Sequence, residues 1–161
     1  IYINNKFISY NNYKAKCAVG KRGISIKKKE GDFITPKGTF KIREIFYRKD
    51  RVQNLITRLK KTVIRKNMGW CDDPKSKKYN KLIYFPFKHS AEKLYRRENI
   101  YDIILVLNFN MNPVKKNKGS AIFIHVAKKN FQPTQGCVAL DKSELIKMVK
   151  SIKKNTVVNI I

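Results

Sequence analysis

Short stretches of alternating apolar and polar residues mark the first third of the chain. Residues 2–8 and 13–19 flank Asn11 and Asn12, a pair typical of tight turns, so the pattern predicts a β-hairpin. Residues 41–46 alternate in the same way and predict a further strand. Successive side chains of a strand point to opposite faces, so this alternation indicates strands with one buried face.

Later apolar segments also favour strands, which we expect at residues 103–107, 121–125, 138–140 and 156–160. The first of these is a continuous apolar run, which suits burial on both faces. Strand alternation would place Ala121, Phe123 and His125 on one face. Many short strands together predict a mainly β domain.

Helical patterns are clearest near the end of the chain. Asp141 and Glu144 have the spacing of a capping box, in which Glu144 reaches back to the cap residue. Apolar residues follow at helical spacing, at Leu145, Met148, Val149 and Ile152. Residues 90–97 predict a second short helix with Ser90 as its N-cap. Residues 48–66 leave helix and strand open, because helical spacing gives way to β-branched residues.

The length of 161 residues predicts a single domain, residues 1–161, large enough for a full hydrophobic core. A hydrophobic fraction of 42% argues against disorder. No stretch approaches the roughly 18 apolar residues that a membrane helix needs, and no signal peptide is visible. The sequence starts at Ile1 without a methionine, so the missing signal carries little weight.

The chain is strongly basic, with 37 Lys and Arg against 11 Asp and Glu and a formal net charge of +26. Such a surface attracts polyanions such as nucleic acid, anionic lipid or cell-wall polymers. Abundant lysine, asparagine and isoleucine also result from an AT-rich genome without any binding role, and we favour that explanation.

Three cysteines, Cys17, Cys71 and Cys137, leave two arrangements open. Cys17 and Cys71 form a disulfide and Cys137 stays free, or both are buried thiols that act as small apolar residues. We favour the second arrangement. No C-x-x-C spacing exists and two histidines are too few for a zinc site, so no metal is expected.

Candidate chemistry lies in the second half of the chain. An apolar run ends at His125, and a loop with Thr134, Gln135 and Gly136 then precedes Cys137. Cysteine attacks as the thiolate, which a nearby imidazole generates near neutral pH. With only two histidines in the chain, Cys137 is the candidate nucleophile and His125 the candidate base, although a core cysteine and a strand-end histidine would give the same pattern. The glycine permits a sharp turn that can bring main-chain N–H groups toward an oxyanion.

A second motif lies upstream, where residues 31–40 contain the pattern D-x-x-T-P-x-G-x-F. Together the two motifs resemble those of the L,D-transpeptidase catalytic domain, the YkuD-like family of peptidoglycan cross-linking enzymes. The resemblance runs from about Lys14 to Ile161 and includes residues 69–73, a segment seen in a bacterial subgroup.

The resemblance implies a two-sheet β-sandwich with one or two short helices and a shallow cleft. It also implies an acyl-transferase that cleaves the diaminopimelate–D-alanine bond of a tetrapeptide stem through a thioester on Cys137, with His125 as proton acceptor and donor. Transfer of the acyl group to a diaminopimelate amine of a neighbouring stem gives a 3–3 cross-link. No cofactor is expected.

The partners implied by the resemblance are peptidoglycan stem peptides. The substrate would place the protein in the periplasm or cell envelope, with a role in cell-wall biogenesis and cell shape. We expect a monomer without a nucleic-acid partner.

Two residues depart from the family pattern. Gln135 stands where most members have a histidine, and it cannot take up a proton at ordinary pH. Ala139 stands where many members have an arginine or asparagine, which removes a group that could contact substrate. Thr134 and Gln135 are candidates for substrate binding or for hydrogen bonds within the loop, and Gly136 for the oxyanion environment.

Other residues have structural interpretations. We expect Thr35, Pro36 and Gly38 to form a rigid corner that the Asp32 carboxylate caps. The remaining candidates are assigned to a surface loop near a cleft (Trp70, Asp72 and Asp73), to a solvated loop (His89) and to packing (Tyr84, Phe85 and Tyr101).

Two other functions compete with transpeptidation. In an L,D-carboxypeptidase, water hydrolyses the same thioester. A non-enzymatic basic module that binds nucleic acid or anionic wall polymer is the third possibility. Aromatic residues are not interleaved with the basic runs in an RNA-binding pattern, which argues against nucleic acid.

Overall fold

The computed structural model describes residues 1–161. Its strands are β1 (Tyr2–Ile3), β2 (Phe7–Tyr10), β3 (Tyr13–Ala18), β4 (Ile24–Ser25), β5 (Thr35–Pro36), β6 (Gly38–Tyr47), β7 (Lys61–Val63), β8 (Met68–Cys71), β9 (Leu82–Tyr84), β10 (Ala91–Lys93), β11 (Ile103–Leu107), β12 (Phe123–Val126), β13 (Val138–Leu140) and β14 (Val157–Ile160). One α-helix, α1 (Lys142–Ser151), and two 3-10 helices, η1 (Asn99–Tyr101) and η2 (Lys129–Phe131), complete the structure.

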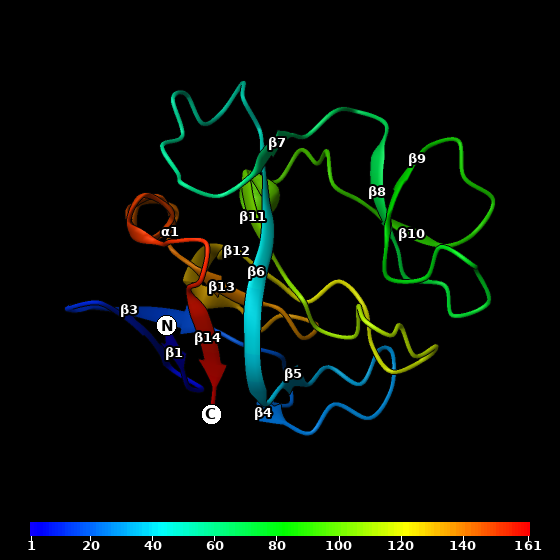
Figure 1. Ribbon diagram of the computed structural model, residues 1–161, viewed down its shortest axis with the longest axis horizontal. Coiled ribbons are helices and arrows are strands. Elements are labelled where there is room, and N and C mark those ends of the chain that lie inside the picture. Colours follow the sequence, from blue (N-terminus) through cyan, green and yellow to red (C-terminus); the bar gives the residue numbers. More distant parts are fainter.

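The main sheet has the order β11-β12-β13-β3-β2-β1-β14-β6-β7, and β6 also pairs with β11. This last pairing closes the sheet on itself. Long strand β6 makes the closure possible, because its first residues pair with β14 and its later residues with β11. In Figure 1 this strand runs from top to bottom through the middle of the molecule, across its long axis. The result is a two-sheet β-sandwich whose sheets share strands, as the resemblance implied.

The main core lies inside the closed sheet and contains 25 buried residues. Helix α1 covers one side of it with Leu145, Met148 and Val149, all three fully buried. Asp141 caps this helix as predicted, since its carboxylate accepts a hydrogen bond from the Ser143 N–H at 2.7 Å. The rest of the capping box is wrong, because Glu144 binds the Lys147 ammonium at 2.8 Å instead.

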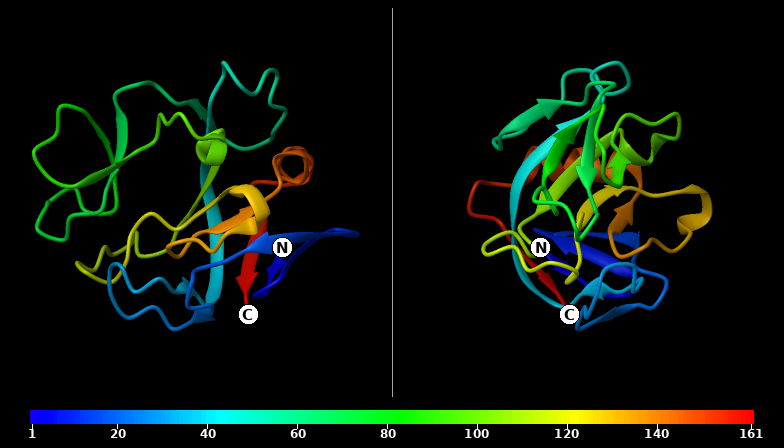
Figure 2. Two further views of the ribbon diagram at one scale, coloured as in Figure 1. Left: turned by 180° about the vertical axis from the view of Figure 1, so that it is seen from behind. Right: turned by 90° about the vertical axis from the view of Figure 1, so that its right-hand side faces the viewer.

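A small three-stranded sheet, order β10-β8-β9, lies to one side of the closed sheet (Figures 1 and 2). A second core of nine buried residues joins the two. Trp70 of β8 is its centre, with ring centroids 5.3 Å from Phe123 and 6.4 Å from Phe46, both edge-on. The expectation that Trp70 lies in a surface loop is therefore wrong, because only 4% of it is exposed.

Most predicted strands are confirmed, including the hairpin of β2 and β3 and the strands β6, β11, β12, β13 and β14. The first predicted strand is divided into β1 and β2. The helix predicted at residues 90–97 is wrong, since residues 91–93 pair with β8 instead. Residues 48–66 contain no helix and end in β7, so their apolar spacing reflects packing of a loop.

Candidate active site

Parallel strands β12 and β13 bring the two candidate catalytic residues together. His125 is level with Ala139 in this pairing, and Ile124 with Val138. Cys137 lies immediately before β13, at the end of the loop that returns the chain from β12. Main-chain hydrogen bonds between β12 and β13 therefore fix the end of this loop beside its beginning.

A cavity of about 200 Å³ opens beside Cys137. Both predicted catalytic residues line it, as do the loop residues Thr134, Gln135 and Gly136. His89 does not, and its Nδ1 lies 2.9 Å from an Asp73 carboxylate oxygen on the small sheet's periphery. His89 is thus half-buried and paired rather than solvated.

The Cys137 thiol is held by main-chain groups. Its Sγ donates to the Ala121 carbonyl at 3.1 Å and accepts from the Phe123 N–H at 3.4 Å. Burial raises the pKa of this thiol to about 12, and the nearby Glu92 carboxylate acts in the same direction. The sequence predicted a thiolate that the imidazole generates near neutral pH, and this is wrong for the resting site, where the cysteine is a neutral S–H group.

The His125 ring is 6% exposed and its Nδ1 lies 2.9 Å from the Val126 carbonyl oxygen. A carbonyl only accepts hydrogen bonds, so Nδ1 carries the proton and Nε2 has a free lone pair. Burial lowers the pKa of His125 to about 4, which keeps the ring neutral at pH 7. No hydrogen bond joins this ring to the Cys137 sulfur; each group bonds to a main-chain carbonyl instead.

Hydrogen bonds within the loop before Cys137 fix its conformation. The Thr134 hydroxyl donates to the Cys137 carbonyl at 2.6 Å and accepts from the Gly136 N–H at 3.1 Å. Gly136 has φ 140°, and a Cβ there would lie 3.0 Å from the Ile34 carbonyl oxygen. The steric requirement for glycine is confirmed, and its N–H is occupied in the loop. The Cys137 N–H has no hydrogen-bond partner, and Gln135 is exposed.

The upstream motif supports this loop directly. The Thr35 hydroxyl accepts from the Gly20 N–H at 2.8 Å and donates to the Cys137 carbonyl at 3.3 Å. The Asp32 carboxylate accepts hydrogen bonds from the main-chain N–H groups of Lys28, Lys29 and Ile34 and from the Lys27 ammonium, so it fixes the loop before β5 rather than the predicted corner at residues 35–38. Burial alone would raise the pKa of Asp32, but these hydrogen bonds outweigh it and lower the pKa to about 2. The two motifs therefore form one unit.

Charged residues from outside both motifs also line the cavity, and only Asp72 among them was predicted from the sequence to lie near a cleft. Glu92 lies on β10 of the small sheet, and burial raises its pKa above the usual range. Arg96 follows shortly after, with its Nη1 3.3 Å from the Glu92 carboxylate. Glu30 and Asp72 bring the acidic lining residues to three, in a chain with only 11 acidic residues.

Tyr101 connects this group to the histidine. Its ring is edge-on to His125 with centroids 5.4 Å apart, and its hydroxyl interacts with the Glu92 carboxylate. Tyr101 is 4% exposed, which agrees with the packing role expected for it, and it also lines the cavity. Asp72 lines the same cavity, so its predicted position near a cleft is confirmed.

Cys17 and Cys71 are separate, buried thiols on strands β3 and β8, as in the arrangement favoured above. Burial raises the pKa of Cys17 to about 12. No three His, Cys, Asp or Glu side chains are grouped in a way that suits a metal ion.

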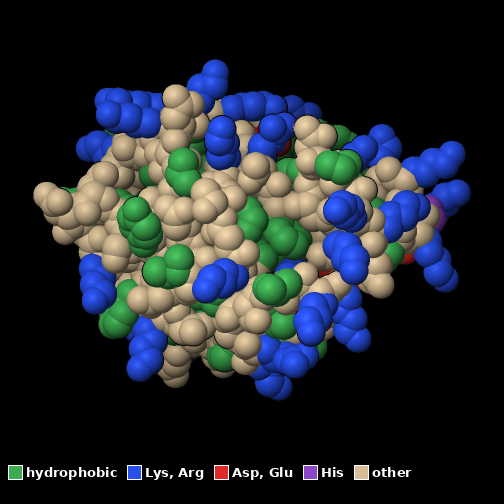
Figure 3. Space-filling model, turned by 60° about the horizontal axis from the view of Figure 1, so that its bottom comes forward, with side chains coloured by type: hydrophobic (Ala, Val, Ile, Leu, Met, Phe, Trp, Pro, Cys, Tyr) green, Lys and Arg blue, Asp and Glu red, His purple; other side chains and the backbone are tan.

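Basic side chains are distributed over the surface. Figure 3 shows Lys and Arg around the whole of one face, with very few acidic groups and no single basic patch. None of the helices is long and apolar enough to cross a bilayer.

Cys137 follows a tight glycine turn, and the neutral His125 lies on the adjacent strand β12 and lines the same cavity. These are the features of cysteine-dependent acyl-transfer enzymes. The family model of the L,D-transpeptidase catalytic domain (YkuD) matches residues 1–160. The chain therefore belongs to this family, whose members use a cysteine nucleophile and act on peptidoglycan. No curated protein matches the chain.

Proposed function

We propose that this protein is an L,D-transpeptidase in which Cys137 attacks the diaminopimelate–D-alanine bond of a peptidoglycan tetrapeptide stem. The observation that carries the proposal is the shared cavity of Cys137 and His125, with each side chain held by main-chain groups. The cellular location that we propose is the cell envelope, where stem peptides occur.

Acylation starts from neutral partners. The Cys137 S–H rotates away from the Ala121 carbonyl and gives its proton to Nε2 of His125 as sulfur attacks the amide carbonyl. A neutral imidazole with a free lone pair suits this step, and a preformed thiolate is not required. The Val126 carbonyl that binds Nδ1 favours the imidazolium that forms.

The unpaired N–H of Cys137 is the main-chain donor available to the developing oxyanion. Gly136 contributes its conformation to this environment, since its own N–H binds Thr134. Collapse of the intermediate expels D-alanine, which takes the proton from His125 and leaves a thioester on Cys137. An amine of a second stem then attacks the thioester and forms a 3–3 cross-link. No step uses an organic cofactor.

The test is incubation of the purified protein with tetrapeptide-bearing muropeptides and identification of the products by mass. A dimer with the combined mass minus D-alanine supports transpeptidation. A tripeptide alone shows that water is the acceptor and that the protein is a carboxypeptidase. Unchanged tetrapeptide, without a thioester on Cys137, would contradict both.

A further inference from the structure

The cavity contains an ion pair that the acylation step does not use. Glu92 and Arg96 both line it, together with Cys137 and His125. Glu92 is fixed by strand pairing, because it lies opposite Trp70 in the ladder between β10 and β8. Its carboxylate therefore projects from a rigid element of the small sheet toward chemistry carried by the closed sheet.

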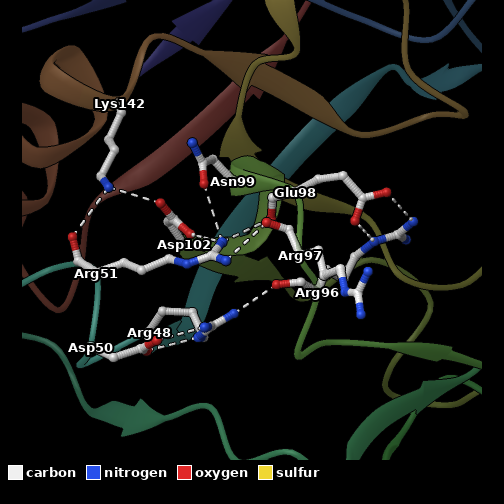
Figure 4. Close-up of polar contacts among 9 residues, drawn as sticks. All are labelled: Arg48, Asp50, Arg51, Arg96, Arg97, Glu98, Asn99, Asp102 and Lys142. Carbon is white, nitrogen blue, oxygen red and sulfur yellow. Dashed lines mark hydrogen bonds and ion pairs between the residues drawn. The ribbon is translucent and has the colours of Figure 1, made fainter.

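The main chain around Arg96 is held by hydrogen bonds from the side chains of Arg48 and Arg51. The Arg48 guanidinium donates to the Arg96 carbonyl at 2.7 Å, and Arg51 donates to the carbonyls of Arg97 at 2.9 Å and Glu98 at 3.2 Å (Figure 4). The carboxylate of buried Asp102 in turn binds Arg51. These contacts fix the segment without using the Arg96 side chain.

The Arg96 side chain itself has only long contacts. Its nitrogens lie 3.3 Å from Glu92 and 3.4 and 3.5 Å from Glu98. A guanidinium has five donors, and charge-assisted hydrogen bonds to a carboxylate are normally about 2.7–2.9 Å long. The main chain of Arg96 is thus fixed, and its side chain still has donors for a carboxylate of a ligand.

The chemistry of the reaction shows what such a pair would recognise. The amine that leaves in acylation is D-alanine, which has a carboxylate on the carbon next to its nitrogen. Attack of an amine on the thioester is the reverse of that step, so leaving and entering amines pass through the same place. Ala139, which also lines the cavity, supplies no cation or amide there.

We propose that Glu92 and Arg96 bind the ammonium and carboxylate of an α-amino-acid head group at the amine side of the scissile bond. This inference rests on the proposed function and names its acceptor class. The carboxylate of the entering amine binds Arg96, and its ammonium binds Glu92. The D-centre of diaminopimelate carries both groups, whereas an amine without a neighbouring carboxylate does not.

Proton transfer accompanies each bond change in this step. The entering ammonium gives one proton to Glu92, whose raised pKa suits a temporary acceptor, and Glu92 passes it to solvent. The free amine attacks the thioester carbonyl. The nitrogen then gives a second proton to His125 as the C–S bond breaks, and His125 returns that proton to the Cys137 sulfur.

The experiment measures exchange of D-alanine on a tetrapeptide-bearing muropeptide. Isotope-labelled D-alanine is compared with D-alaninamide, which has the same amine but no carboxylate. We expect the wild-type protein to prefer D-alanine by about 10- to 100-fold in kcat/KM, the value of one charge-assisted contact. Arg96→Gln should reduce this ratio to near one, and Arg96→Lys should keep part of it. Glu92→Gln should lower exchange of both amines relative to hydrolysis.

Arg97→Gln is the matched control, because Arg97 is exposed and does not line the cavity. It should keep the wild-type preference. Equal use of both amines by the wild-type protein, or a wild-type preference that survives in folded Arg96→Gln, overturns the inference while thioester formation still supports the proposed function. Absence of a thioester in the wild-type protein defeats the proposed function itself.

Discussion

The closed sheet and the small sheet contribute different parts of the site. The closed sheet carries the proposed reacting groups, with His125 on β12 and Cys137 immediately before the adjacent strand β13. The small sheet and the segment after it carry the charged groups, Glu92 and Arg96, that face them across the cavity. The groups that we assign to bond formation thus belong to the closed sheet. The groups that we assign to selection of the amine belong to the small sheet and the segment after it.

Asn80 joins the two regions through four hydrogen bonds. Its Oδ1 accepts from the Trp70 indole at 3.0 Å and from the Ala121 N–H at 3.1 Å. Its Nδ2 donates to the carbonyls of Phe109 and Asn110. Because the Ala121 carbonyl accepts the Cys137 thiol, the amide connects the small sheet to the nucleophile. The comparison therefore predicts that changes within the closed sheet stop the reaction and changes at the junction weaken it.

The largest effect is expected from Cys137→Ala. Loss of the nucleophile should lower turnover by about 10⁴-fold or more, and the fold should persist because a partly exposed cysteine adds little packing. Muropeptide turnover and thermal unfolding check this. Turnover at the wild-type rate would move the chemistry away from the closed sheet.

His125→Gln should lower turnover by about 10²- to 10⁴-fold, because it removes the proton acceptor. The resting Cys137 is a neutral thiol, so its alkylation by iodoacetamide should change much less. His89→Gln, on the other side of the comparison, should leave both rates unchanged. If His89 governs turnover and His125 does not, the choice of base is wrong.

Asn80→Ala tests the junction. The substitution leaves the Trp70 and Ala121 N–H groups without acceptors, and each buried unsatisfied group costs about 1–3 kcal/mol. We expect the free energy of unfolding to fall by about 3 kcal/mol and turnover to fall with it. Denaturant unfolding provides the measurement, and exposed Asn67→Ala is the control. Equal stability of the two variants would show that the sheets are held together without this amide.

Acid should destabilise the closed sheet through its histidine. The pKa of His125 is about 4 in the folded protein, against an ordinary histidine value of 6.5, so the unfolded chain binds more protons between these values. Stability therefore decreases as the pH falls through this interval, by about 3 kcal/mol at most. His125→Gln should flatten this dependence in urea unfolding curves. Parallel curves for both proteins would exclude His125 as the source.

The strands of the closed sheet were predictable where the pattern is local. Residues 103–107 are apolar without interruption because β11 is buried on both faces, and Asp141 marks the helix start by its own hydrogen bond. The closeness of the proposed nucleophile and base was predictable for the same reason, since one loop connects their strands and both residues line one cavity.

The small sheet was not predictable in this way. Residues 91–93 form a strand only because β8 pairs with them, and their sequence suited a helix. Trp70 is buried by Phe46 and Phe123, which are distant in sequence. Glu92 and Arg96 reach the cavity through this long-range packing, so no spacing relative to Cys137 indicates them. The neutral state of the thiol likewise follows from burial, which a motif does not encode.

Strand β14 pairs with β1 on one side and with β6 on the other, although Tyr2 and its partner Asn159 are almost the whole sequence apart. The contact order is therefore high, and chains dominated by such distant pairings fold slowly because loop-closure entropy is lost before the contacts form. During synthesis the ring stays open until residues 157–160 have emerged, and the edges of β1 and β6 remain without partners. A ribosome-bound chain that lacks residues 157–160 should bind chaperones that recognise unpaired strand edges, and the folded protein should not.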